Sequence, residues 1–105
     1  MTEPNAWLED HRRDAAERHT KAALELLEPI RHDWSRMEQT RPAGRALAAL
    51  MADLGKVVAI LKGDAGVAAD MLGSVVQRLD GMNDARLHDA RKRAQSARDE
   101  ILEQR

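Results

Sequence analysis

The chain has no cysteine, phenylalanine or tyrosine among its 105 residues, and tryptophan occurs only twice. Without cysteine there can be neither a disulfide nor a thiolate metal site. Aromatic residues favour strands, and no segment alternates apolar and polar side chains over a strand length. The interior must therefore be built from aliphatic residues and methionine, which predicts an all-α fold.

A large excess of charge of either sign is also lacking, because the net charge is −1. Overall charge therefore gives no reason to expect binding to nucleic acid or to a membrane. The chain begins MTEPNAWLEDHRRD, without the apolar stretch of a secretory signal, so we expect a cytoplasmic protein. The 13 arginines against 4 lysines, together with abundant alanine, are typical of a high-GC bacterial or phage genome.

Most of the apolar residues lie in one block, residues 43–79, which a Gly63-Asp64 pair divides. Its large apolar side chains recur every three or four residues, which predicts two helices and not strands. Arg45, Asp53 and Lys56 interrupt the first half of the block, so it does not read as a membrane span.

The charged segments on either side are also helical in period. We predict a single all-α domain over residues 1–105, bundle-like, with a central apolar hairpin and two long charged arms. Gly63 is expected to end the second helix in a left-handed conformation, and Asn83 to cap the fourth. The predicted helices span 3–39 with a kink at Pro29, 42–62, 65–80 and 84–103.

Self-association is expected from helix length and from the second helix. The first helix is nearly twice as long as either helix of the hairpin, so part of it overhangs. The polar stripe of the second helix is narrow, and a helix that is apolar on most sides is surrounded by partners. We therefore expect a homodimer or a larger homo-oligomer.

No catalytic or metal-binding motif is complete. None of the four histidines has an acidic residue three positions before it, as a di-iron bundle requires, and there is no HExxH sequence. The glycines form no phosphate-binding loop, and no serine lies in a nucleophile-elbow context. We expect no metal, no cofactor and no enzymatic activity.

Two thin apolar seams suggest where helices meet. The seam of the last helix contains alanines at three- and four-residue spacing, as in a close-packed coiled coil. His19 lies on the stripe of the first helix, where a polar residue typically fixes register. Tryptophan near a terminus is also a frequent interface anchor. The interface candidates are Trp7, Leu8, Ala15, His19, Leu87, Ala90, Ala94, Ala97 and Ile101.

The last helix also has a local excess of cations, which could neutralise phosphates. These candidates are Arg86, Arg91, Lys92, Arg93 and Arg98. The sequence thus favours a small interaction protein that binds a protein partner stoichiometrically, as an adaptor, inhibitor or assembly factor. Two alternatives stay open: nucleic-acid binding through the last helix, and an oligomer that sequesters an anionic small ligand such as a nucleotide.

Overall fold

The structure is a computed structural model that describes residues 3–103, with side chains for residues 10–103. Within these residues it contains four α-helices, one short 3₁₀ helix and no strand, so the predicted all-α bundle is confirmed. The helices are α1 (Glu3–Arg36), α2 (Arg41–Ile60), α3 (Ala65–Met82) and α4 (His88–Leu102), with the 3₁₀ helix η1 (Ala85–Leu87) before α4.

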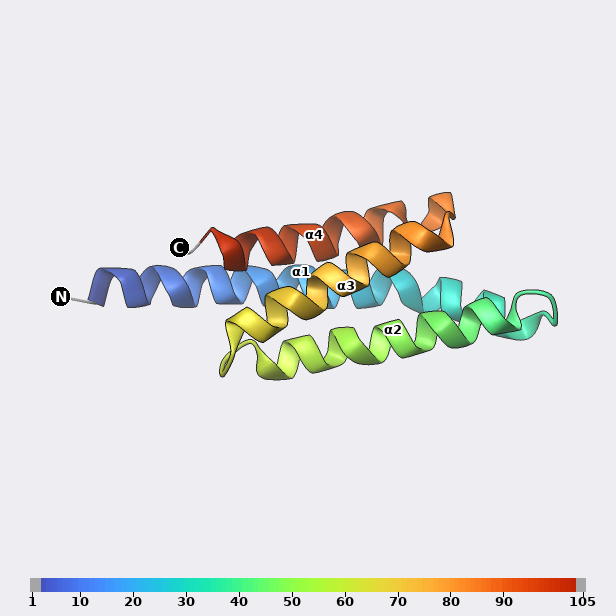
Figure 1. Ribbon diagram of the computed structural model, residues 1–105, viewed down its shortest axis with the longest axis horizontal. Helices are drawn as coiled ribbons and strands as arrows, with labels where there is room; N and C mark the ends of the chain where they lie inside the picture. Colours follow the sequence, from blue (N-terminus) through green and yellow to red (C-terminus); the bar gives the residue numbers. More distant parts are fainter. Residues whose placement is uncertain (1–2, 104–105) are drawn as a thin grey trace.

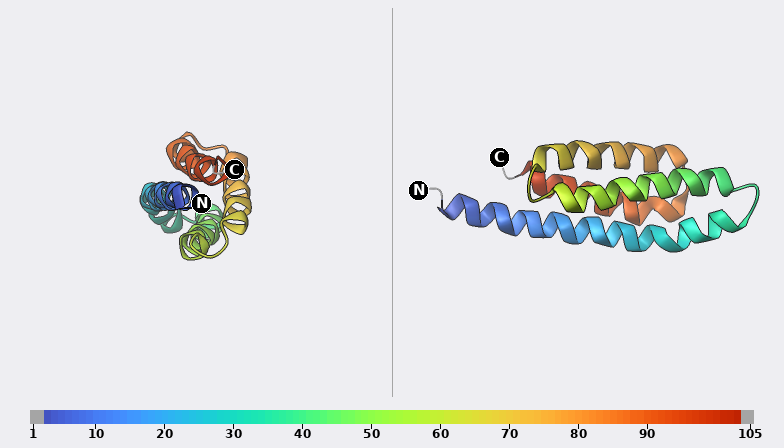
Figure 2. Two further views of the ribbon diagram at one scale, coloured as in Figure 1. Left: turned by 90° about the vertical axis from the view of Figure 1, so that its left-hand side faces the viewer. Right: turned by 90° about the horizontal axis from the view of Figure 1, so that it is seen from below.

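The four helices occupy the corners of a square. α1 packs beside α2 and α4, and α3 packs beside the same two helices (Figures 1 and 2). Consecutive helices run in opposite directions because the links between them are short. The fold is an elongated up-down-up-down bundle of 57 × 21 × 18 Å.

The turn after α1 ends the first helix earlier than predicted, at Arg36 instead of residue 39. The Thr40 hydroxyl donates to the Trp34 carbonyl at 2.8 Å and to the Met37 carbonyl at 3.4 Å. The Thr40 backbone N–H also donates to the Met37 carbonyl at 3.2 Å. These bonds use carbonyls that a longer helix would have paired with its own N–H groups. α1 itself continues through Pro29 and bends toward α2 in its last turns (Figure 2).

Two predicted caps are wrong. No described glycine has a positive φ, so Gly63 is not left-handed; its N–H bonds to the Ile60 carbonyl at 3.0 Å in a tight turn. Asn83 has φ 52° and ψ 50°, and it ends α3 instead of starting the next helix. Asp84 takes the capping role, accepting a hydrogen bond from the Arg86 N–H at 2.9 Å. Asparagine tolerates the left-handed region well enough to take the place of a C-terminal glycine.

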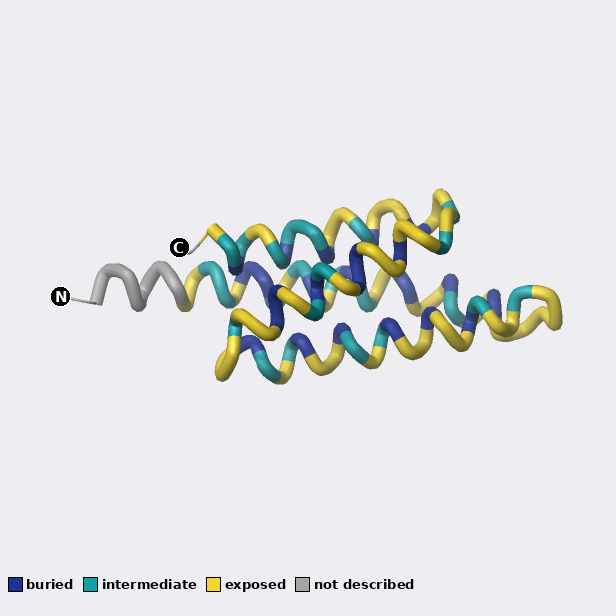
Figure 3. Tube along the Cα trace, viewed as in Figure 1, coloured by how far each residue is buried: buried dark blue, intermediate teal, exposed yellow. Residues whose placement is uncertain are grey.

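The core runs the length of the bundle and draws on all four helices, whose buried sides face inward (Figure 3). α2 and α3 supply most of its large aliphatic side chains, as the apolar block predicts. α1 and α4 meet largely through alanines, which let two helices approach closely. The wholly or almost wholly buried large side chains are Leu27, Leu47, Leu50, Leu54, Val57, Leu61, Leu72, Val75, Leu79 and Leu87.

Gly44 marks the closest approach between α1 and α2. A Cβ atom there would lie 3.1 Å from the Ser35 hydroxyl oxygen, 3.2 Å from the Ser35 nitrogen and 3.3 Å from the Trp34 carbonyl carbon. Two of these three neighbours are backbone atoms, which cannot rotate away. Only glycine fits at this crossing without moving one helix.

Candidate interaction surfaces

The predicted seam of α4 lies inside the chain itself. Its three alanines are completely buried and belong to the core that the four helices share. These side chains hold α4 in its own bundle and do not present a surface to a second molecule. The buried interface candidates are Ala15, Leu87, Ala90, Ala94, Ala97 and Ile101. Trp7 and Leu8 lie outside the residues whose side chains are described.

His19 lies half-buried at the outer edge where α1 meets α4. Arg93 Nη1 donates to His19 Nδ1 at 3.1 Å; since arginine has no acceptor, the imidazole nitrogen accepts. Further along the same edge, Arg12 Nη1 lies 3.2 Å from Glu100 and 3.1 Å from Glu103. His19 thus joins two helices of one chain.

The five cations around α4 do not form one strip. Arg86 and Arg93 are seven residues apart and lie on the flank toward α1, where Arg86 covers Trp34 and Arg93 meets His19. Arg91 and Arg98, also seven apart, lie on the flank toward α3. Lys92 is exposed between the two flanks.

The two arginines on the α3 flank are held against that helix. Arg91 Nε lies 3.5 Å from the Asp80 carboxylate, and Arg98 Nε lies 3.1 Å from where a Gly73 Cβ would be. Both Nε atoms are buried without a hydrogen-bond partner among the described residues. The Nε end of each guanidinium group therefore packs against α3, although the Arg91 side chain is 38% exposed. Because the five cations are divided between two flanks, they form no continuous basic surface on the part of α4 that the structure describes.

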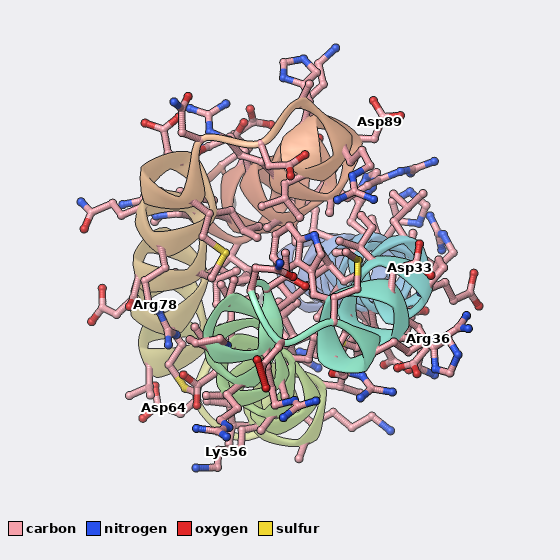
Figure 4. All side chains as sticks on the ribbon, turned by 90° about the vertical axis from the view of Figure 1, so that its right-hand side faces the viewer. Asp33, Arg36, Lys56, Asp64, Arg78 and Asp89 are labelled. Carbon is pink, nitrogen blue, oxygen red and sulfur yellow. The ribbon has the colours of Figure 1, made fainter. Side chains whose placement is uncertain are left out.

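The outer face of α2 is unlike an ordinary solvent-facing helix. Its exposed residues are mostly alanine and glycine, and the cations Arg45 and Lys56 are the only charged ones beyond the first residue of the helix. The single acid of α2, Asp53, is held by Arg78 of α3 at 2.6 Å. Lys56 projects away from the bundle (Figure 4). We call this face the α2 outer face: Arg45, Ala46, Ala48, Ala49, Ala52, Gly55, Lys56 and Ala59.

A pocket of about 420 Å³ opens at the end of the bundle where α1 turns into α2. Trp34, which is only 6% exposed, lies at its base, and the Arg86 guanidinium lies 5.7 Å from the centroid of the indole ring. Met37, 56% exposed, forms an apolar wall. We call this the end pocket: Asp33, Trp34, Arg36, Met37, Thr40 and Arg86.

The end pocket was not predicted from the sequence. The spacing of Ile30, Trp34 and Met37 indicates one face of a helix, but Arg86 is 52 residues away from Trp34. Nothing in a helical period tells which arginine of α4 or η1 covers an indole on α1. The only sequence signal is weak: a tryptophan and a methionine shortly before Pro42, which lies in the first turn of the next helix.

The shifted carboxyl groups are all explained by an adjacent partner. The hydrogen bond from Lys21 lowers the pKa of Glu17, and that from Arg31 lowers the pKa of Glu28. The Arg86 backbone N–H lowers the pKa of Asp84. The first two are exposed ion pairs within one helix, and the third is a helix cap, so these groups stabilise helices locally.

Among residues 10–103, no group of three or more histidine, aspartate or glutamate side chains could hold a metal ion. The described helices include none with the length and apolarity to cross a membrane. No family model, curated protein or solved structure matches the chain.

Proposed function

We propose that the protein acts as a non-enzymatic binding module that engages another polypeptide stoichiometrically, as an adaptor, inhibitor or assembly factor. The observation that supports this proposal is the α2 outer face. A bundle helix normally carries polar and charged residues on its solvent side. α2 carries alanines there, although it already buries a full apolar stripe in the core.

Such a face suits a second helix. Alanine and glycine side chains let a helix approach closely, and their ordering costs no rotamer entropy. Arg45 and Lys56 flank the alanines without acids of their own helix to neutralise them. The proposed partner surface therefore has small apolar residues and places no cation opposite Arg45 or Lys56.

A second copy of the chain is the first partner to test, because the sequence predicts a homo-oligomer. Antiparallel packing of two α2 outer faces about Ala52 would place Lys56 of each copy opposite alanine of the other, so the like charges would not meet. We propose the cytoplasm as the compartment, since a chain without cysteine forms no disulfide and is compatible with a reducing environment.

Native mass spectrometry of the protein purified at low salt tests the proposal. Ala52 is exposed at the centre of the face, so Ala52→Glu leaves the bundle folded and places a charge in the contact. Ser74→Glu, on the exposed side of α3, is the matched control. We expect a stoichiometric assembly in the wild type and in Ser74→Glu, and its loss, at least tenfold in affinity, in Ala52→Glu.

A bare monomer at micromolar concentration with no captured polypeptide would contradict the proposal, as would an assembly that Ala52→Glu does not weaken. A bound mass that matches a nucleotide would favour an oligomer that sequesters an anionic small ligand. A bound mass that matches an oligonucleotide would favour nucleic-acid binding through the last helix. Oligonucleotide binding should then fall steeply with salt, because released counterions drive it.

A further inference from the structure

The end pocket has an apolar part and a cationic part, side by side. Met37 and the edge of Trp34 provide apolar contact, while Arg36 and Arg86 bring two positive charges to the same opening. Tryptophan, methionine and arginine are among the residue types that are enriched where proteins bind one another. The volume of about 420 Å³ is within the range of about 300–1,000 Å³ that ligand pockets span.

The two arginines are held differently. Arg86 lies over the indole of Trp34 and its Nε is 3.5 Å from the Asp84 carboxylate, so two contacts hold its guanidinium beside the pocket. Arg36 is exposed and makes no ion pair or hydrogen bond with the residues that the structure describes. The pocket thus combines one preorganised guanidinium with one that is available to a ligand, against a single acid, Asp33. Figure 4 shows Asp33 and Arg36 at the end of α1, on the opposite side of the bundle from Arg78 of α3 and from Asp64, which caps α3.

The start of α2 adds to the positive potential at this opening. Thr40 precedes α2, but its hydroxyl donates to carbonyls of the preceding turn and does not cap the helix. The first turn of α2 contains no acid, whereas Asp64 and Asp84 cap the two elements that follow. An uncapped helix start favours a negative group beside it.

We propose that the end pocket binds a carboxylate that a partner polypeptide carries next to a large apolar side chain. The carboxylate meets Arg36 and Arg86, and the apolar side chain lies against Met37 and the exposed edge of Trp34. Arginine suits this task because its planar guanidinium matches a carboxylate with two parallel hydrogen bonds. The inference depends on the proposed function, the binding of a polypeptide, and adds the chemistry that the partner presents.

Trp34 provides the measurement. In a Trp7→Phe variant it is the only tryptophan, so the fluorescence of the protein reports on the pocket alone. The probes are two peptides, acetyl-Glu-Leu-Phe-Asp-amide and its neutral counterpart acetyl-Gln-Leu-Phe-Asn-amide. We expect a saturable change in emission with the acidic peptide, and binding at least tenfold weaker with the neutral one. A tenfold loss of affinity is what the removal of one hydrogen bond to a charged group is expected to cause.

Two substitutions make the assignment specific. Arg36→Ala removes an exposed, unpaired charge and should weaken the acidic peptide about tenfold without unfolding the bundle. Lys92→Ala removes an exposed cation of α4 outside the pocket and should leave binding unchanged. Equal binding of both peptides, no saturation, or an equal effect of the two substitutions would overturn the proposal. Octanoate binding as tightly as the peptide would assign the pocket to small organic acids and overturn the polypeptide assignment.

The Ala52→Glu variant separates this inference from the proposed function. It alters the α2 outer face and leaves the end pocket intact, so it should bind the acidic peptide as the wild type does. Assembly that depends on Ala52, without peptide binding at the pocket, would refute the inference and leave the proposed function standing.

Discussion

Asp84 caps η1, the short 3₁₀ helix that leads directly into α4. Its carboxylate accepts a hydrogen bond from the Arg86 N–H at 2.9 Å, and Asn83 directly before it has the left-handed conformation that ends α3. Each side chain suits its own position: asparagine tolerates a positive φ, and aspartate caps a helix. The sequence suggested a break at residues 81–84 but did not tell which of the two caps which helix.

Replacing the Asp84 cap should cost stability in a pH-dependent way. We expect Asp84→Ala to lower the free energy of unfolding at pH 7 by about 1 kcal/mol, as loss of a cap does. Because the Arg86 N–H lowers the pKa of Asp84 in the folded state, the carboxylate contributes fully above the unfolded pKa. That contribution should disappear as pH falls through the lower, folded pKa.

Chemical denaturation of the wild type and of Asp84→Asn, measured from pH 7 down to pH 2, tests the charge separately, because asparagine keeps the cap. The difference in unfolding free energy between the two proteins should shrink as the solution becomes acidic. A difference independent of pH would show that the charge of Asp84 contributes nothing.

At the scale of the helices, α2 contains two glycines in contrasting surroundings. Gly44 lies against the backbone of α1, whereas a Cβ at Gly55 would have no neighbour within 4 Å. Helix propensity alone treats the two positions alike, because glycine in a helix interior costs about 0.5–1 kcal/mol relative to alanine. The distance to α1 therefore decides whether alanine at Gly44 or at Gly55 raises or lowers the stability of the bundle.

Alanine at these two positions should change stability in opposite directions. Gly44→Ala should lower the free energy of unfolding by about 1–3 kcal/mol, since overpacking forces the helices apart. Gly55→Ala should raise it by about 0.5–1 kcal/mol. Thermal or urea unfolding of the two variants measures both effects, and a gain of stability in Gly44→Ala would show that α1 and α2 do not approach as closely as described.

The helices themselves could be predicted from apolar spacing, and their neighbours could not. The three- and four-residue period of Ala90, Ala94 and Ala97 identified the inner side of α4 correctly. A period, however, specifies a face of a helix and not the chain that covers it. The helices of the same chain cover that face, whereas the alanines of α2 stay exposed.

At the scale of the whole molecule, the bundle is uneven. α1 and α4 join through core alanines, with ion pairs from Arg12 to Glu100 and Glu103 along their outer edge, and the arginines of α4 pack into the flanks of the bundle. The single acid of α2, Asp53, forms an ion pair with Arg78 of α3. The outer face of α2 therefore exposes alanines and the cations Arg45 and Lys56. A charged substitution on the α2 outer face should therefore weaken assembly more than the same substitution on the outer face of another helix.

The end pocket could not be derived from the sequence for a related reason. Its lining comes from the end of α1, the following turn and η1, which only the bundle brings together. Trp34 is buried, and the cation above it comes from a residue that no helical period connects with it. Pockets built at the ends of helices depend on turn geometry, and the turns were the least predictable part of this chain.

Site-specific photo-crosslinking from position 52 tests the central claim most directly. A photoreactive residue at Ala52 should give one discrete product of fixed stoichiometry, either a dimer of the chain or a complex with one partner, and the same residue at Ser74 should not. Crosslinking that is absent at position 52, or equally strong at both positions, would contradict the claim that the α2 outer face is the binding surface.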